Sequence, residues 1–312
     1  MKFKVLCGAG LVCAPILACG LVLAGCAEQA PRPQARTYYS PTVRATPSTL
    51  TAQASVFESY MRRARGIDAS FSGPGEVSEA LQAGASHEPR QLEEGMIAYA
   101  AVAALQEPRF VDAIKASPNR AELARRLASD PAAALALPGG EAAAARASGA
   151  LSSQGEALRE QGLRVKKASY AVQHQAWSKH NVSDPRGRLA RVKALSSEPY
   201  RASAQDSARL YEAMAQSAHR GGASGPVVTR AVALAALNVL GEGAEGRSLM
   251  SEPRTASCLR MAKLNLYQCL AAAGPQYEDI YCLGQHAMAD TGQCVVEATH
   301  PAHVATRMSY RR

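Results

Sequence analysis

Aromatic side chains are scarce in this sequence: they make up 5% of 312 residues, with a single Trp and four Phe. Long basic runs are also missing, because Lys and Arg are interleaved with Asp and Glu along most of the chain. Nucleic-acid-binding domains usually combine a basic patch with a recognised motif or a set of stacking aromatics. We therefore expect no nucleic-acid partner.

Common enzyme motifs are missing as well. The chain has no Gly-x-Ser-x-Gly elbow, no phosphate-cradling glycine loop and no dinucleotide fingerprint. Few stretches alternate apolar and polar residues with the period of a strand, whereas alanine is abundant and 47% of residues are hydrophobic. Small side chains with high helix propensity favour closely packed helices, so the sequence predicts an all-α, multi-helix fold.

The first 26 residues have the pattern of an export signal. Lys2 and Lys4 form a short basic start, and the uncharged stretch 5–25 follows. The stretch ends in Leu23-Ala24-Gly25-Cys26, which resembles the lipobox of bacterial lipoprotein signals. That resemblance implies cleavage before Cys26, a diacylglyceryl group on its thiol, and attachment to a lipid membrane through the acylated Cys26.

Two alternatives concern the same segment. About 21 apolar or small residues are long enough to span a bilayer as an uncleaved anchor, although Pro15 and several glycines interrupt them. A second, poorer lipobox-like match ends at Cys19. Ala27 follows Cys26, and in enterobacteria an aspartate at that position retains lipoproteins in the inner membrane. By that resemblance we expect the outer membrane of a bacterial envelope, with the protein facing the periplasm or the cell surface.

The chain after the signal divides by composition. Residues 26–50 are rich in Pro, Thr and Ser and should form a semi-extended tether with a reach on the order of 70 Å. The formal charge of the chain is +9, and +7 without Lys2 and Lys4. The expected organisation is a signal peptide at 1–25, the tether at 26–50, an Ala-rich helical domain at 51–254, a four-cysteine helical hairpin at 255–300 and a basic tail at 301–312.

Local signals predict where helices start. A capping side chain followed by proline satisfies an orphan N–H and places proline where no N–H is needed. The clear cases are Ser117-Pro118, Asp130-Pro131 and Asp184-Pro185. Ser203 and Asp206 resemble a capping box before a long helix that carries Leu210, Met214 and His219. Glu-Pro pairs are interpreted as further boundaries, at Glu88-Pro89, Glu107-Pro108, Glu198-Pro199 and Glu252-Pro253.

Two segments should lie at the centre of the fold, and a third should form a hinge or a loop. Met96–Leu105 and Val227–Leu240 are apolar nearly all round, which predicts burial on every side. The region 138–155 is rich in Gly, Ser and Ala, and we interpret it as a hinge or a loop between two helical halves. Val56, Tyr60 and Met61 are spaced for one apolar face of a helix before Gly66.

Few residues in the sequence resemble a catalytic or metal-binding site. Glu58-Ser59 resembles the glutamate–serine pair of lytic transglycosylases, and Ala273-Gly274-Pro275 weakly resembles a later motif of that family, whose other motifs are missing. A zinc site is a second alternative, with ligand types at Cys282, His286, Cys294, His300 and His303 in a non-standard spacing. The remaining histidines are interpreted as surface or helix-face residues: His87, His174, His180 and His219. We assign no catalytic residue, metal ligand or cofactor.

Four cysteines near the C-terminus carry the most specific pattern. They allow three pairings, but Ser257–Ala273 and Gln276–Ala289 read as two helices separated by Gly274-Pro275, the second ending near Thr291-Gly292. The midpoints of Cys269 with Cys282 and of Cys258 with Cys294 both fall at Pro275 or the next residue. An antiparallel hairpin turning there predicts the nested disulfides Cys258–Cys294 and Cys269–Cys282; four free buried thiols are the alternative.

The nested arrangement is similar to the hairpins of coiled-coil-helix-coiled-coil-helix proteins, although the spacing between paired cysteines differs here. The resemblance concerns geometry rather than ancestry. Taken together, the patterns predict a lipid-anchored envelope protein with a structural or binding role, whose candidate partners are peptidoglycan or another envelope protein. The alternative is a peptidoglycan hydrolase or lytic transglycosylase that uses Glu58.

Overall fold

In the computed structural model, residues 49–216 and 224–301 are described, and they are helical with no named strand among them. The first half contains α1 Thr49–Arg65, α2 Pro74–Ala85, α3 Pro89–Ala104, α4 Pro108–Lys115, α5 Arg120–Ser129, the 3-10 turn η1 Pro131–Ala134 and α6 Gly140–Val172. The second half contains α7 Ala176–Lys179, α8 Pro185–Ser197, α9 Ala204–Gln216, α10 Pro226–Leu240, the 3-10 turn η2 Glu245–Leu249, α11 Pro253–Ala272, α12 Gln276–Cys282, the π-helical η3 Leu283–Asp290 and α13 Thr291–Ala298. The predicted all-α class is confirmed.

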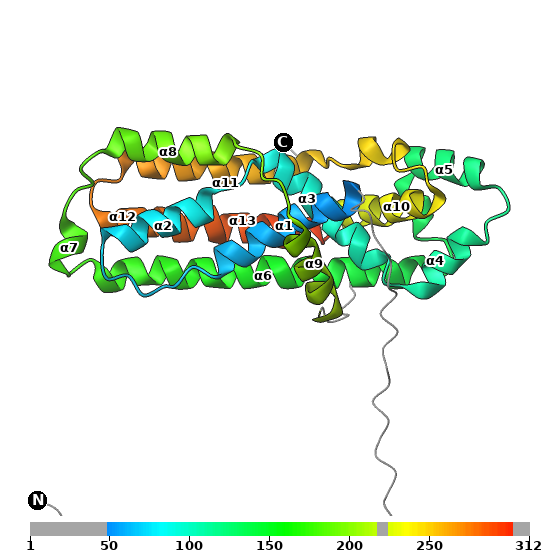
Figure 1. The fold of residues 1–312 in the computed structure, drawn as a ribbon, viewed down its shortest axis with the longest axis horizontal. Coiled ribbons are helices and arrows are strands. Elements are labelled where there is room, and N and C mark those ends of the chain that lie inside the picture. Colours follow the sequence, from blue (N-terminus) through cyan, green and yellow to red (C-terminus); the bar gives the residue numbers. More distant parts are fainter. Residues whose placement is uncertain (1–48, 217–223, 302–312) are drawn as a thin grey trace, which may run out of the picture. The chain divides into compact units, whose positions relative to one another are not determined.

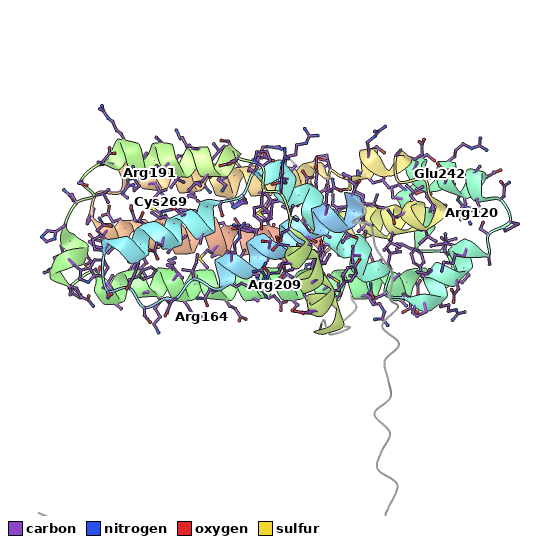
Figure 2. The ribbon with its side chains drawn as sticks, in the orientation of Figure 1. Arg120, Arg164, Arg191, Arg209, Glu242 and Cys269 are labelled. Atoms are coloured by element: carbon purple, nitrogen blue, oxygen red, sulfur yellow. A yellow bond between two sulfur atoms is a disulfide. The ribbon has the colours of Figure 1, made fainter. Side chains whose placement is uncertain are left out.

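The two segments predicted to be central form α3 and α10. Met96 to Ala104 are buried without interruption, and so are Ala231 to Leu237. Helix α3 packs against α1, α6 and α10, and Figure 1 shows the long α6 running beside the other helices. Charged side chains lie on the outer helices, as Arg120, Arg164 and Arg191 do in Figure 2. Burial of the apolar helix faces is the main force holding the fold together.

The predicted boundaries agree with the structure where the signal is a local cap. Glu88 and Glu252 precede the Pro that opens α3 and α11, and each side chain accepts hydrogen bonds from two backbone amides of the first turn. Asp184 does the same for Gly187 at the start of α8. Ser203 and Asp206 form the reciprocal capping box of α9. At Ser117-Pro118, however, α5 begins only at Arg120, after Asn119.

The interpretation of 138–155 as a hinge or loop is wrong over 140–155, because α6 runs unbroken from Gly140 to Val172. Within 138–155, Gly139 is the one glycine with a left-handed backbone, with φ +81°, and it makes the turn that precedes the helix. The glycines inside α6 instead permit close packing. A Cβ on Gly162 would lie 2.5 Å from the Ala289 amide nitrogen of η3. Glycine therefore marks a helix contact at these positions and not a break.

The four-cysteine hairpin is not a separate body. The described residues, 49–216 and 224–301, belong to one compact unit, and α11, η3 and α13 pack against α3, α6 and α8. The predicted end of the second arm near Thr291-Gly292 is wrong, since α13 continues to Ala298. The first helix begins at Thr49, two residues before the expected start of the helical domain at residue 51. Cys26 and His219 lie outside the described residues.

Candidate functional site

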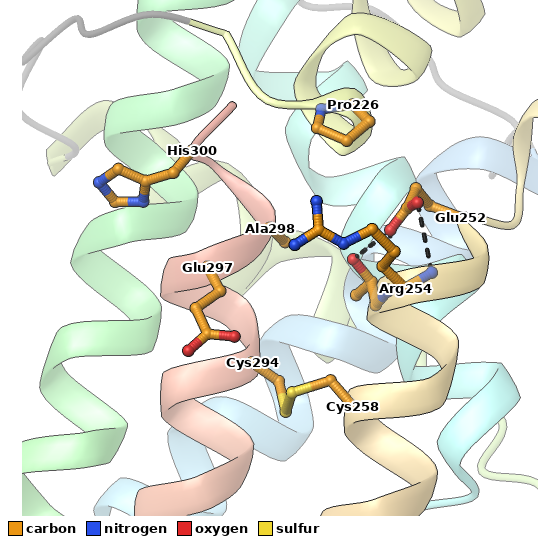
Figure 3. A pocket seen from close by; sticks show the side chains of 9 residues that line it. Pro226, Glu252, Arg254, Cys258, Cys294, Glu297, Ala298 and His300 are labelled. Carbon is orange, nitrogen blue, oxygen red and sulfur yellow. Dashed lines mark hydrogen bonds between the residues drawn. A yellow bond between two sulfur atoms is a disulfide. The ribbon is translucent and has the colours of Figure 1, made fainter. Parts of the chain in front are cut away.

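The outer disulfide joins the start of α11 to α13. Cys258 and Cys294 are bonded, with their Cα atoms 5.7 Å apart. Both line a cleft of about 140 Å³ together with Glu252, Arg254 and Glu297 (Figure 3). Cys258 is half-buried, whereas Cys294 is 3% exposed. A small thiol reagent therefore has a route to the outer disulfide along this cleft.

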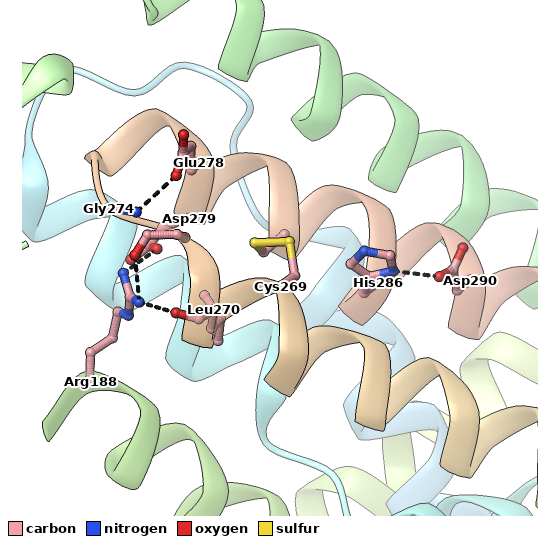
Figure 4. Close-up of a disulfide and its surroundings, with 10 residues drawn as sticks. Arg188, Cys269, Leu270, Gly274, Glu278, Asp279, His286 and Asp290 are labelled. Atoms are coloured by element: carbon pink, nitrogen blue, oxygen red, sulfur yellow. Dashed lines mark hydrogen bonds and ion pairs between the residues drawn. A yellow bond between two sulfur atoms is a disulfide. The ribbon is translucent and has the colours of Figure 1, made fainter. Parts of the chain in front are cut away.

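The inner disulfide lies at the turn of the hairpin. Cys269 and Cys282 are bonded, with a Cα–Cα distance of 5.6 Å, so both disulfides have the nested pairing that the sequence predicts. Near it, Arg188 of α8 reaches into the turn (Figure 4). Its guanidinium lies 2.5 Å from Asp279 and also donates to the carbonyl oxygens of Leu270 and Ala273. Helix α8 is thereby fastened to both arms of the hairpin.

Burial dominates the electrostatics of that ion pair. The side chains of Arg188 and Asp279 are 6% and 2% exposed. Burial raises the pKa of the Asp279 carboxyl to about 6, although the guanidinium beside it acts in the opposite direction. Replacing a buried pair of this kind by apolar residues of similar volume is often neutral or stabilising, whereas removing one partner is strongly destabilising. Nothing in the sequence distinguishes these two residues from surface charges, because only the tertiary packing buries them.

A π-helical segment brings the cysteines of the second arm onto one face. Eleven residues lead from Cys258 to Cys269, and twelve lead from Cys282 to Cys294. In an α-helix, eleven residues return to within about 20° of the starting face, whereas twelve end roughly 120° away. Residues Leu283–Asp290 are π-helical, and an i→i+5 turn holds one residue more than an α-turn. The segment absorbs the extra residue, so both cysteines face α11.

A second buried polar cluster surrounds Lys263 of α11. Its Nζ donates to the Ala85 carbonyl at 2.9 Å, lies 3.2 Å from His87 Nδ1 and 3.3 Å from Ser196 Oγ. Lys263 is 4% exposed and His87 is 5% exposed, so the expectation that His87 lies on a surface is wrong. Burial lowers the pKa of the Lys263 ammonium to about 7. Burial and then the Lys263 charge lower the pKa of His87 well below its usual value.

Glu58 faces inward and is held in an ion-pair network. It is 3% exposed, and both of its carboxylate oxygens accept from Arg62 Nε, at 3.2 and 3.3 Å. Arg62 also pairs with Asp206 of α9 at 3.0 Å. Tyr200 donates its hydroxyl to Asp206 at 2.9 Å and lies 3.3 Å from Ser59 Oγ. These contacts dock α9 on α1, and Glu58 and Ser59 belong to that joint.

The zinc candidates are engaged elsewhere. Cys282 and Cys294 lie in different disulfides, His286 Nδ1 is 2.7 Å from Asp290, and His300 Nδ1 is 2.9 Å from the Val296 carbonyl. His303 lies outside the described residues. Within residues 49–216 and 224–301, no group of three or more His, Cys, Asp and Glu side chains could hold a metal ion.

Among the helices that the structure describes, none combines the length and the apolar character needed to cross a membrane. A second cleft, of about 400 Å³, lies between the end of α1 and α2 and is lined by Arg63, Asp68, Phe71, Glu76 and Glu79 among others.

Comparison with protein-family models, with curated proteins and with solved structures finds no match to this chain.

Proposed function

We propose that this chain is a lipid-anchored protein of the bacterial cell envelope with a structural or binding role. The observation that carries the proposal is the succession of signal features in the sequence of the N-terminus: Lys2 and Lys4, an uncharged stretch, and then the lipobox Leu23-Ala24-Gly25-Cys26. The two disulfides support it, because disulfides persist in oxidising compartments such as the periplasm. Ala27 supports delivery to the outer membrane.

A non-catalytic role fits the placement of Glu58. A glutamate that protonates a glycosidic oxygen must reach its substrate and must hold a proton. Glu58 is buried, and its carboxylate is occupied by Arg62. The candidate partners remain peptidoglycan or another envelope protein.

Labelling with palmitate tests the anchor. Cells that express the chain and are fed labelled palmitate should label it, and Cys26→Ser should abolish the label and accumulate the uncleaved precursor. Cys19→Ser is the matched control, since it removes the second lipobox-like cysteine and should leave labelling unchanged. Full labelling of Cys26→Ser together with loss of label in Cys19→Ser would move the anchor to Cys19; labelling of neither wild type nor control would reject lipidation.

Peptidoglycan separates the two roles. The full chain should produce no cleared zone in a peptidoglycan gel, and co-sedimentation with purified peptidoglycan would identify it as the partner. A cleared zone that disappears in Glu58→Gln would instead establish the hydrolase. Recovery of the protein with the outer membrane on a density gradient is expected, and recovery with the inner membrane alone would contradict the location.

A further inference from the structure

Positive charge is concentrated in one part of the helical body. Residues 161–197 contain eight Lys and Arg, one Asp and no Glu. Residues 104–146, which include α4 and α5, contain six Lys and Arg and five Asp and Glu. Figure 1 shows α7 at one end of the helices and α4 and α5 at the other. The excess charge of residues 161–197 therefore lies at one end, and we call these residues, from Gln161 of α6 through α7 to the end of α8, the basic end.

Most cations of the basic end point to solvent. Arg188 is buried against Asp279, and Lys166 is half-buried with its Nζ 5.1 Å from the centre of the Tyr281 ring. The exposed cations are Arg164, Lys167, Lys179, Arg186, Arg191 and Lys193. The one acid of the segment, Asp184, caps α8 and lies 3.8 Å from Arg191, where solvent screens both charges.

Carboxylates on neighbouring helices compensate the basic end only in part. On α12, Asp279 is paired with Arg188, and Glu278 accepts from the Gly274 amide. On α2, Glu76 binds Ser72, and both Glu76 and the exposed Glu79 line the cleft that also contains Arg63 and the exposed Asp68. None of these carboxylates forms a salt bridge with the six exposed cations.

Aromatic side chains lie among these cations. Tyr170 of α6 is 52% exposed, and its ring centre is 6.3 Å from that of Tyr281. Trp177, the single Trp of the chain, is half-buried in α7. Leu163, which lies seven residues before Tyr170 on α6, is 42% exposed. Aromatic rings beside Lys and Arg are typical of surfaces that meet lipid headgroups, where one part of a side chain is apolar and another is wet.

The basic end is held in a fixed shape by the stapled turn. The Val182 amide donates to Gly274, and the Gln276 amide donates to His180, so the loop after α7 is bonded on both sides of Pro275. Arg188 fastens the start of α8 to the same turn. The exposed cations are therefore presented by a rigid frame and are not carried on a loose loop.

We infer that the basic end docks on an anionic lipid surface, with the headgroup phosphates as the ligand. The inference rests on the proposed function only in that a lipid anchor at Cys26 keeps the domain beside a membrane. Each Lys or Arg near an anionic bilayer favours binding by about 1 kcal/mol, which corresponds to roughly fivefold in partitioning. Docking would hold the domain in one orientation on the membrane and leave α4 and α5 facing away.

Trp177 provides a local probe of this contact. The full chain is mixed with vesicles of phosphatidylcholine, or of phosphatidylcholine with phosphatidylglycerol, each containing brominated lipid that quenches nearby tryptophan. We expect quenching of Trp177 on the anionic vesicles, little on the neutral ones, and reversal at high salt, since the screening length falls to about 3 Å at 1 M. Equal quenching on neutral vesicles would overturn the inference, because the N-terminal segment alone would then explain it.

A pair of triple variants tests the position of the contact. Lys167→Gln, Lys179→Gln and Arg186→Gln together should raise the anionic lipid needed for half-maximal quenching roughly a hundredfold. Arg109→Gln, Lys115→Gln and Arg125→Gln remove the same charge from exposed positions on α4 and α5. This control variant should change the amount of anionic lipid needed for half-maximal quenching by no more than a few fold. Equal effects of the two variants would overturn the inference, because net charge and not the basic end would then govern binding.

Two further measurements distinguish docking on lipid from binding of a soluble polyanion and from anchoring at Cys26. Trp177 quenching by soluble brominated dextran sulfate but not by anionic vesicles would assign the basic end to a polyanion and reject the lipid surface. Palmitate labelling of Cys26 is independent of Trp177. The anchor can therefore fail while docking persists, and docking can fail while the anchor stands.

Discussion

Gly155 of α6 and Gly292 of α13 face each other across a close helix contact that the hairpin makes. A Cβ added to Gly155 would lie 2.8 Å from the Gly292 carbonyl oxygen, and one added to Gly292 would lie 2.7 Å from the Gly155 carbonyl oxygen. Neither position has room for a side chain, because backbone lies on the other side. Glycine at both positions lets the hairpin pack directly on α6.

We expect Gly155→Ala to lower the free energy of unfolding by about 1–3 kcal/mol, since the two helices must move apart to admit the methyl group. Gly75→Ala is the matched control: Gly75 lies in the first turn of α2 with nothing within 4 Å of its added Cβ. There the substitution should stabilise by roughly 0.5–1 kcal/mol, because alanine loses less backbone entropy. Urea unfolding measures both, and a loss of similar size at Gly75 would show that the close contact is not the cause.

The two disulfides should differ in how much they stabilise. They close loops with sequence separations of 36 and 13 residues. By the loop-closure relation the outer bond contributes about 4 kcal/mol and the inner about 3 kcal/mol. Cys258→Ser should therefore lower the urea midpoint more than Cys269→Ser does.

Thiol chemistry checks the pairing independently. In Cys294→Ser, the Cys258 thiol lines an open cleft and should react with a small maleimide, while Cys269 and Cys282 stay protected. Peptide mapping of the wild type without reduction should recover Cys258 with Cys294 and Cys269 with Cys282. Labelling of Cys269 or Cys282 in the Cys294→Ser variant would contradict the nested arrangement.

The predictions from sequence succeeded where the signal is local. Glu252 before Pro253 fixes the start of α11 through bonds to its own first turn, so no distant residue is needed to predict it. The nested pairing followed from spacing about Pro275 alone. The extra residue of the second arm was not explained by the sequence, because the π-helical turn at Leu283–Asp290 depends on how that arm packs against α6.

Glycine and buried charge account for most of the failures. Gly139 makes a turn with positive φ, whereas Gly155 and Gly292 admit a neighbouring helix, and the residue type is the same in all three cases. Likewise, Lys263 and Arg188 cannot be told from surface cations in the sequence. Both become buried only because helices distant in the chain close over them.

The stability of the fold should depend on pH through Lys263. Its pKa is about 7 in the folded protein, against an ordinary value of 10.5. Between these values the unfolded chain binds a proton that the folded chain does not, so stability rises with pH by up to about 1.4 kcal/mol per pH unit. The contribution is present in full above the unfolded pKa and is lost as pH falls towards 7. Below that pH the penalty is constant.

Lys263→Met isolates this contribution. Methionine removes the buried charge at similar length, so the variant should unfold at higher urea than wild type at pH about 7 and should lose most of the rise between pH about 7 and 9. The upper limit matters because burial also raises the pKa of Tyr99 to about 12, which makes alkaline pH above 10 destabilising on its own. An unchanged pH slope in Lys263→Met would contradict the assignment. Lys193→Met, at an exposed position of α8, controls for the loss of one lysine.

The contributions of Arg188 and Asp279 to the free energy of unfolding should be coupled. Arg188→Met leaves the Asp279 carboxylate buried without a cation, and the expected loss is about 3–5 kcal/mol of unfolding free energy at pH about 7.5. Without the guanidinium, burial and then the Glu278 charge raise the pKa of Asp279 unopposed, so the carboxyl becomes protonated and neutral in mild acid. The deficit relative to wild type should therefore shrink at pH about 5.

Arg188→Met combined with Asp279→Leu should recover most of the loss, because an apolar pair of similar volume leaves no uncompensated charge. Urea unfolding of wild type, Arg188→Met, Asp279→Leu and the double variant at both pH values measures the coupling. Additive losses with no pH dependence would mean that the ion pair does not hold α8 to the stapled turn.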